Sequence, residues 1–325
     1  MRALAPWRQG WTHRLGAMGL AIACLTATGA TAQTPRAQIS AALPDVARDD
    51  FLEVRTFAIR PDHDDGVTVS VFTPQYGQQT GAAVIVAPGG GYISLAGSLE
   101  GRQVADWFAA RGVTAFVLRY RQGADHPLPE PIEDGERAVR FVRANAEAFG
   151  IDTDRIGMIG FSAGGHLAAM TTRLSDPGDP AAADRIERVS SRPDFLILAY
   201  PWLQATAIDA RGGSAYCRFA KIARWDCRPQ DYVGYTPLPG VADQAPPTFI
   251  YHTTDDGLVP VQGSVDLYQA LATAGVDVEM HLFAHGPHGS GLGGRDPSLS
   301  LWPQALDAWL RAKGYLAVKP EGEAR

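Results

Sequence analysis

From Ala82 to Gly314 the chain alternates short apolar runs with segments whose apolar residues recur at helical spacing. The runs, such as Ala82–Pro88 and Val113–Tyr120, are apolar almost throughout, which is typical of strands covered on both faces. This alternation predicts parallel β-α-β units, and therefore an α/β fold whose mostly parallel central sheet has helices on both faces. In such sheets ligands bind beyond the carboxyl ends of the strands.

The same patterns predict the order of the elements. Strands are expected over residues 82–88, 113–120, 155–161, 193–201, 246–256 and 276–285, and helices over 98–112, 130–150, 166–174, 261–275 and 301–314. Val67–Pro74 alternates apolar and polar residues and predicts an outer, half-buried strand. We expect one domain over 51–316, preceded by an irregular arm at 33–50 and followed by a tail at 317–325.

The first 32 residues differ from the rest of the chain. Three arginines precede the apolar run Leu15–Leu25, and small residues follow up to Ala32. This layout predicts a secretory signal peptide cleaved after Ala32, and so export to the periplasm or the extracellular space. One alternative is a single anchoring helix, although the run is shorter than the ~20 residues that a membrane span needs. Another is lipid attachment at Cys24, for which the preceding residues are a poor signal.

Removing this segment makes the chain more acidic. The full sequence carries 29 basic and 35 acidic residues, and residues 1–32 hold three of the basic ones and none of the acidic ones. The mature chain therefore has a net charge near −9. This charge argues against nucleic acid or an anionic membrane as a partner of the mature protein.

Cleavage also leaves two cysteines, Cys217 and Cys227. An exported chain meets an oxidising compartment, where such a pair closes a disulfide; two free thiols are the alternative. The spacing of cysteines and histidines typical of a structural zinc site does not occur, and we expect no metal.

The segment Gly160-Phe161-Ser162-Ala163-Gly164 lies where a predicted strand meets a predicted helix. A serine on such a sharp turn has a strained backbone, and side chains two positions away on either side would collide, which favours glycine there. The turn lifts the hydroxyl to the positive end of the helix. We therefore predict that Ser162 is a nucleophile, with an ordinary turn serine as the alternative.

A nucleophilic serine needs a histidine base that a carboxylate orients, and in this arrangement the chain order is serine, acid, histidine. Asp255 and Asp256 follow one predicted strand, and His285 and His288 follow the next. We predict Asp256 as the acid, with Asp255 as a capping or supporting residue. His288, within a glycine-rich loop, is the predicted base and His285 the alternative. Structural roles are expected for the remaining histidines near these elements, His166, His252 and His281.

Three glycines follow the strand at Ala82–Pro88 directly. They allow backbone N–H groups to approach a ligand oxygen with no side chain in the way. We assign the predicted oxyanion donors to Gly90, Gly91 and Ala163. A phosphate-binding loop is the alternative, but no Lys-Ser/Thr pair follows the glycines and no G-x-G-x-x-G occurs.

Residues 201–245 interrupt the alternation of elements. The segment is rich in glycine, proline and aromatic residues, contains both cysteines, and is too long for an ordinary connection. We interpret it as a cap-like insertion over the site, with a disordered surface loop as the alternative. Its aromatic residues argue against disorder.

Five segments in this order resemble the α/β-hydrolase superfamily: APGGGY, EGRQVADWFAARGVTAFVLRYR, GFSAGGHLAA, HTTDDGLVPV and HGPHGSGL. Within that superfamily the chain resembles the secreted acetyl-xylan and feruloyl esterase-like branch, related to hormone-sensitive lipase, from Phe51 to Gly314. The resemblance implies the α/β-hydrolase fold. It matches the family's nucleophile to Ser162, its acid to Asp256 and its base to His288.

The chain departs from many relatives at Pro88, which stands where they carry a histidine in His-Gly-Gly-Gly. The backbone donors are unaffected, but support for the loop must come from elsewhere. This departure makes the chain more similar to the xylan-esterase branch than to typical lipases.

The resemblance implies a secreted serine esterase that removes short acyl groups, often acetyl, from carbohydrates such as xylan, without a metal or organic cofactor. Tyr92 and Trp202 are candidate walls of its pocket, and plain core aromatics are the alternative for both. Two other functions stay open. A serine peptidase of the prolyl-peptidase type usually adds a propeller or lid domain, and a non-catalytic carbohydrate-binding relative has no need of a triad.

Overall fold

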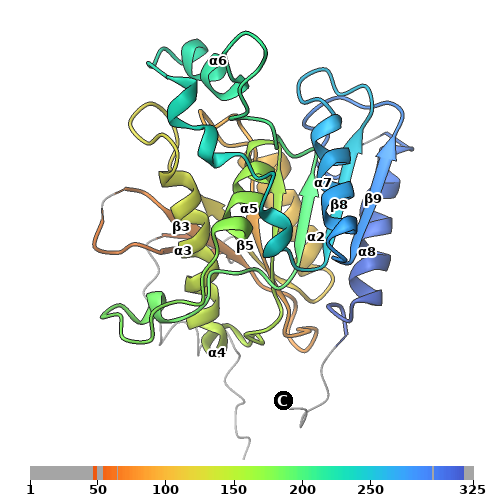
Figure 1. Ribbon diagram of the computed structural model, residues 1–325. Coiled ribbons are helices and arrows are strands. Elements are labelled where there is room, and N and C mark those ends of the chain that lie inside the picture. Colours follow the sequence, from red (N-terminus) through yellow and green to blue (C-terminus); the bar gives the residue numbers. More distant parts are fainter. Residues whose placement is uncertain (1–46, 50–53, 64, 295, 318–325) are drawn as a thin grey trace, which may run out of the picture. The chain divides into compact units, whose positions relative to one another are not determined.

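A computed structural model describes residues 47–49, 54–63, 65–294 and 296–317 (Figure 1). The predicted signal peptide, most of the arm at 33–50 and nearly all of the tail at 317–325 lie outside these residues. The described residues belong to one structural unit. None of the helices within them is long and apolar enough to cross a bilayer.

The described residues form one sheet of nine strands in the order β1-β2-β3-β5-β4-β6-β7-β8-β9. Neighbours from β5 to β9 are parallel, whereas β1, β2 and β3 pair antiparallel. The predicted mostly parallel α/β sheet is therefore confirmed. The strands are β1 (Ala47–Asp49), β2 (Val54–Ala58), β3 (Thr68–Phe72), β4 (Ala83–Ala87), β5 (Thr114–Arg119), β6 (Ile156–Phe161), β7 (Leu196–Ala199), β8 (Thr248–Thr253) and β9 (Val278–Phe283).

Helices cover both faces of this sheet (Figure 1). One core joins α3, α5 and α7 to one face, and the other joins α2 and α8 to the opposite face. Of the helices, η1 is a π-helical turn and η2 to η6 are short 3-10 segments. Their bounds are η1 (Gly97–Arg102), α2 (Gln103–Ala109), α3 (Glu130–Ala144), α4 (Ala146–Phe149), α5 (Ala163–Leu174), η2 (Arg185–Arg188), α6 (Ala215–Ile222), η3 (Pro229–Asp231), η4 (Val233–Tyr235), η5 (Val241–Asp243), α7 (Gln262–Thr273), η6 (Leu299–Leu301) and α8 (Trp302–Ala312).

The continuous apolar strands pack on both sides, as their sequences predict. Every residue of β4 and β6 is buried. In β4, Ile85 faces the core of α3, α5 and α7, whereas Val84 and Val86 face the core of α2 and α8. Because neither face meets water, these strands show no alternation of polar and apolar residues.

The antiparallel edge differs from the prediction. β3 is half-buried as expected, but β2 and β1 lie beyond it, so it is not the outer strand. The arm at 33–50 is also not irregular throughout, because Ala47–Asp49 pairs with Val54–Thr56. Pairing at a sheet edge uses backbone groups, and the short sequence Ala-Arg-Asp carries no alternation that would have revealed it.

The insertion at 201–245 contains α6 and three short helical segments rather than a featureless loop. Figure 1 shows α6 beyond the end of the sheet toward which β8 and β9 run. Cys217 within α6 forms a disulfide with Cys227, with their Cα atoms 5.2 Å apart. The bond closes the chain that follows α6 back onto the helix.

Candidate active site

Ser162 lies on the sharp turn between β6 and α5. Its backbone has φ 51° and ψ −118°, a strained conformation for a residue with a side chain. A Cβ at Gly160 would lie 2.1 Å from the carbonyl oxygen of Gly164, and a Cβ at Gly164 would lie 2.1 Å from that of Ala87. These contacts are the physical reason for both glycines of the motif.

Two hydrogen bonds link Ser162, His288 and Asp256 in series, which is the arrangement of a catalytic triad. Ser162 Oγ lies 2.8 Å from His288 Nε2, and His288 Nδ1 lies 2.8 Å from Asp256 Oδ2. The acid loop follows β8 and the histidine loop follows β9, and these two strands are neighbours in the sheet. The structure thus brings together the three side chains that the sequence singled out.

Four donors surround the carboxylate of Asp256. Oδ1 accepts the N–H groups of Leu258 and Val259, at 2.9 and 2.8 Å. Oδ2 faces His288 and also His252 Nε2, at 3.2 Å. Burial raises the pKa of Asp256, but these hydrogen bonds together outweigh burial and hold that pKa well below its ordinary value. The carboxylate therefore stays ionised throughout the pH range of ordinary enzymes.

His252 contributes to this arrangement in a way that the sequence did not reveal. It is fully buried, as expected of a structural histidine. Nε2 faces two acceptors, Asp256 Oδ2 and the carbonyl oxygen of Val259 at 3.1 Å, so it carries the proton and donates. Nδ1, 2.8 Å from Ser264 Oγ, then accepts from that hydroxyl. The histidine thereby holds the same oxygen of Asp256, Oδ2, that faces His288.

The alternative acid and base form a separate pair at the surface. His285 Nδ1 lies 2.9 Å from Asp255 Oδ2, and the His285 side chain is 87% exposed. Asp255 Oδ1 also accepts the N–H of Gly286 at 2.8 Å. This pair ties the acid loop to the histidine loop.

The two other histidines lie away from the reacting groups. His166 is buried in α5 between Tyr92 Oη and the carbonyl oxygen of Tyr235, each 2.7 Å away. Burial lowers the pKa of His166 to about 4, so its imidazole is neutral near pH 7. His281 lies 2.7 Å from Glu279 on β9.

The glycine loop after β4 leaves donors free around the nucleophile. Among the described residues, none accepts a hydrogen bond from the N–H groups of Gly90, Gly91 or Ala163. Gly90 and Gly91 have φ 137° and 65°, and a Cβ at Gly90 would lie 1.9 Å from the carbonyl oxygen of Ser94. Only glycine fits here, and the free N–H groups are available to an oxyanion.

A cavity of about 290 Å³ opens over Ser162. Trp202 and Phe219, both from the insertion, form part of its wall together with Leu258 and Val259. The ring centroids of Trp202 and Phe219 lie 4.9 Å apart. The cavity is small and its walls are largely apolar.

The prediction that Tyr92 lines this pocket is wrong. Its side chain is buried in the core, where its hydroxyl donates to His166 Nδ1 and its ring packs edge-on against Tyr120 and Tyr216. The backbone of Tyr92 has φ 63°, a conformation that the sequence alone does not reveal. Phe219 stands in the wall instead.

Within the described ranges, His, Cys, Asp and Glu side chains form no group of three or more that is arranged to hold a metal ion.

A family model for the alpha/beta hydrolase fold matches residues 84–291. The chain belongs to the alpha/beta hydrolase family. Ser162, Asp256 and His288 all fall within the matched residues. The predicted fold class is thereby confirmed.

Curated relatives of this alpha/beta hydrolase include enzymes of xylan breakdown. An acetylxylan esterase of Xylanibacter ruminicola is 30% identical over 254 residues, which cover 77% of this chain and 49% of that protein. The endo-1,4-beta-xylanase B of Butyrivibrio fibrisolvens is 34% identical over 213 residues, covering 63% of this chain and 32% of that one. This chain thus spans about half or less of the length of these relatives.

Solved structures of esterases share the architecture. An acetyl ester-xyloside bifunctional hydrolase from Caldicellulosiruptor lactoaceticus has a TM-score of 0.70 and 34% identity, covering 78% of this alpha/beta hydrolase and 91% of that chain. An esterase from Thermogutta terrifontis has a TM-score of 0.67 and 25% identity, covering 87% and 99%. In the second case nearly the whole neighbour is matched.

Proposed function

We propose that the protein is a serine carboxylic-ester hydrolase that removes short acyl groups, acetyl above all, from carbohydrates such as xylan. The observation that carries this proposal is the line Ser162–His288–Asp256, with both links at 2.8 Å, beneath a small apolar cavity. The similarity to an acetylxylan esterase and to an acetyl ester-xyloside hydrolase supports the substrate class.

The proposed reaction proceeds through an acyl-enzyme. The Nδ1–H of His288 donates a hydrogen bond to Asp256, which leaves Nε2 unprotonated and free to take the proton of Ser162 as Oγ attacks the ester carbonyl. The oxyanion then accepts from the N–H groups of Gly90, Gly91 and Ala163. His288 returns the proton to the leaving alcohol, and water, deprotonated by His288 in turn, hydrolyses the acyl-enzyme.

Two competing functions receive less support. The hydrogen-bonded line of Ser162, His288 and Asp256 would be superfluous in a non-catalytic carbohydrate-binding relative. A prolyl-type peptidase needs a pocket for a peptide with its proline ring, whereas the relatives quoted above are named for esters and xylan.

Export is a second part of the proposal. The layout of residues 1–32 favours a cleaved signal peptide, and the disulfide between Cys217 and Cys227 suits an oxidising compartment. We expect the mature protein from the native host to begin at Gln33 and to lie in the periplasm or outside the cell. Intact-mass analysis of that protein tests this directly. A mass that retains residues 1–32, or adds a lipid, contradicts it.

The substrate class is tested by measuring acetate release from acetylated xylan beside p-nitrophenyl acetate, butyrate and octanoate. We expect acetate release from xylan and a fall in kcat/KM with chain length, because the cavity is small and Phe219 forms part of its wall. Phe219→Ala should raise the relative rate on octanoate, whereas Ile222→Ala, an exposed residue of the same helix, should not. Cleavage of a prolyl-nitroanilide in place of these esters would favour the peptidase.

A further inference from the structure

Glu100 is a buried carboxylate beside the reacting groups. It lies in η1, is 3% exposed and lines the cavity over Ser162. Among the described residues, no lysine, arginine or histidine lies within ion-pair distance of it. Burial raises the pKa of Glu100, while hydrogen bonds from Tyr200 and Gly89 and the charge of His288 lower it. A buried acid without a cation is costly to keep unless it has a task.

Each oxygen of this carboxylate holds a different loop. Oε2 accepts the N–H of Gly89 at 2.7 Å, immediately before the two glycines of the oxyanion loop. Oε1 accepts the hydroxyl of Tyr200 at 2.8 Å. A Cβ placed at Gly89 would lie 2.7 Å from Oε2 and 2.9 Å from Ser162 Cβ, so the loop is pressed between the carboxylate and the nucleophile.

Tyr200 carries the connection on to the histidine loop. Its hydroxyl accepts the N–H of Gly291 at 2.9 Å, and its ring packs edge-on against the His288 imidazole, with centroids 5.1 Å apart. The residue has φ 37°, in the left-handed region that a side chain adopts only under constraint. Such strain persists where the surroundings over-determine it, as this chain of contacts does.

These contacts supply support that the loop sequence lacks. Pro88, which precedes the glycines, offers no N–H and no polar side chain. Its carbonyl oxygen accepts the hydroxyl of Tyr120 at 2.7 Å, and the next residue, Gly89, is held by Glu100. Tyr120 and Glu100 therefore both hold the backbone of this loop in place.

We propose that Glu100, acting through Gly89 and Tyr200, is the positioning residue that holds the oxyanion loop and the histidine loop in register over Ser162. The proposal rests on the ester hydrolase function above and deepens it. Donors that are already aimed need no reorganisation when charge develops, so their alignment is worth most in the transition state. Glu100 itself touches no reacting atom in this scheme.

The test uses Glu100→Gln, Glu100→Ala and Tyr200→Phe in the full-length mature enzyme. For Glu100→Ala we expect kcat on p-nitrophenyl acetate to fall about 100-fold, with KM within about twofold, because a misaimed donor costs transition-state rather than ground-state binding. Glu100→Gln retains an oxygen for Gly89 and should be partly rescued, to a loss of about tenfold. Tyr200→Phe should lose about as much as Glu100→Gln.

A transition-state analogue separates positioning from a structural role. When Ser162 Oγ adds to a methyl trifluoromethyl ketone, the new C–O bond leaves the ketone oxygen as an anion at the oxyanion position and the proton on His288. Affinity for this ketone should fall by the same factor as kcat/KM in each variant. Tyr315→Phe is the matched control. It removes a hydroxyl that donates to the carbonyl oxygen of Asp194, just before β7 begins, and it should leave the ketone affinity and kcat/KM unchanged.

The outcomes are distinguishable. If Ser162→Ala keeps its activity, the proposed function fails. If Ser162 is essential but Glu100→Ala keeps full kcat and full ketone affinity, only the positioning role fails. A variant that loses kcat and ketone affinity together, with an unchanged far-ultraviolet spectrum and melting temperature, supports it. Loss of activity with a collapsed melting temperature in Glu100→Ala, Glu100→Gln and Tyr200→Phe alike overturns it in favour of a structural role.

Discussion

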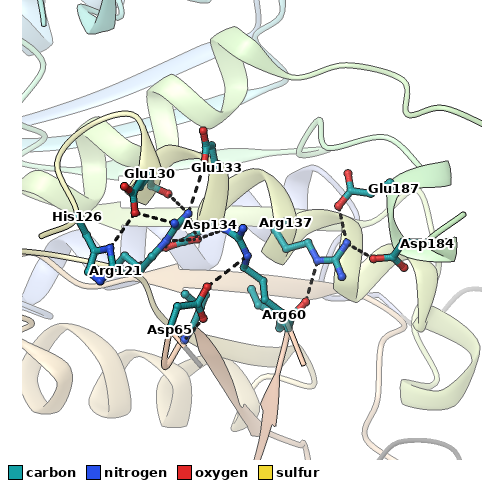
Figure 2. Close-up of polar contacts among 12 residues, drawn as sticks. Arg60, Asp65, Arg121, His126, Glu130, Glu133, Asp134, Arg137, Asp184 and Glu187 are labelled. Carbon is teal, nitrogen blue, oxygen red and sulfur yellow. Dashed lines mark hydrogen bonds and ion pairs between the residues drawn. The ribbon is translucent and has the colours of Figure 1, made fainter. Parts of the chain in front are cut away.

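Two cavities among the described residues differ in size and in lining. The larger one is not lined by Ser162, Asp256 or His288. The cavity over Ser162 measures about 290 Å³, whereas a cavity of about 430 Å³ lies against α3. The second is bordered by what we term the α3 charge cluster, shown in Figure 2. Its members are Arg60, Asp65, Arg121, His126, Glu130, Glu133, Asp134, Arg137, Asp184 and Glu187.

In the α3 charge cluster every drawn charge faces an opposite one. Asp134, fully buried, accepts from the backbone N–H of Arg121 at 2.8 Å and from its guanidinium at 3.0 Å, and Arg60 reaches it at 3.3 Å. Arg137 pairs with both Asp184 and Glu187 (Figure 2). The charges of this cluster are thus paired with one another within the protein, and Glu133, Asp184 and Glu187 also meet solvent.

Around Ser162, by contrast, several backbone donors have no acceptor among the described residues. Asp256 is fully satisfied, but the N–H groups of Gly90, Gly91 and Ala163 donate to no described residue, and Gly90 and Gly91 line the cavity over Ser162. The difference teaches that neither volume nor charge marks a site. A site is marked by donors that remain unanswered next to a nucleophile whose base is already in place.

The largest expected effect is on the activity of the cavity over Ser162, and it tests the nucleophile itself. Ser162→Ala should lower kcat on p-nitrophenyl acetate by about 10⁵-fold, because the reaction loses its covalent intermediate. The melting temperature should stay within a degree or two of the wild type, since one hydroxyl is lost. A residual rate within tenfold of the wild type would falsify the assignment of Ser162.

Asp134→Ala should have the opposite profile. Removing this carboxylate leaves Arg121, 8% exposed, and Arg60 without their buried partner, so we expect the free energy of unfolding to fall by about 3 kcal/mol. The kcat of the folded variant should stay near the wild-type value. Urea unfolding beside the ester assay measures both. Glu133→Gln, at an exposed carboxylate of the same cluster, is the control and should change stability by less than about 0.5 kcal/mol.

His252→Phe sharpens the comparison within the site. It removes the donor behind Asp256 while keeping a buried ring, so we expect kcat to fall about tenfold, in line with one hydrogen bond to a charged group. His252→Gln retains an N–H donor and should recover part of the loss. His281→Gln on β9 is the control. Equal activity of all three variants would show that Asp256 needs no such support.

The smallest expected effect is a pH dependence at the rim of the larger cavity. Burial, reinforced by neighbouring carboxylates, raises the pKa of Glu136 from 4.5 to about 7. Between these values the unfolded chain has released a proton that the folded chain keeps, so stability falls as pH rises through this window. Glu136→Gln should therefore be more stable than the wild type at pH 8, by about 1 kcal/mol, and equal to it at pH 4. A difference that is the same at both pH values contradicts the assignment.

Much of the fold follows from the sequence because its strongest patterns are local. The continuous apolar runs give β4 to β8. Gly160 is required by a contact within the turn itself, and Gly164 by the close approach of the backbone at Ala87. The predicted helix over 130–150 is interrupted at Asn145, where φ −114° and ψ 16° end α3 before α4 begins. β1 escaped prediction because its pairing depends on backbone alone.

The site divides in the same way. Ser162, Asp256 and His288 were predictable because each stands at a strand end within a distinctive segment. Glu100 and His252 were not, because their roles depend on contacts that only the folded chain brings together rather than on any motif. Tyr92 was misplaced for a different reason, since its positive φ was not visible in the sequence.

The contact between Phe219 and Gly91 has a consequence for protein engineering. A Cβ at Gly91 would lie 2.8 Å from the Phe219 ring, so Phe219, which forms part of the cavity wall, also packs closely against the glycine loop. Replacing Phe219 by a smaller residue, to admit bulkier esters, also removes this packing contact from the loop. A variant that accepts larger esters is therefore expected to turn over more slowly. Recovering its rate would need another side chain of α6 that packs against the glycine loop.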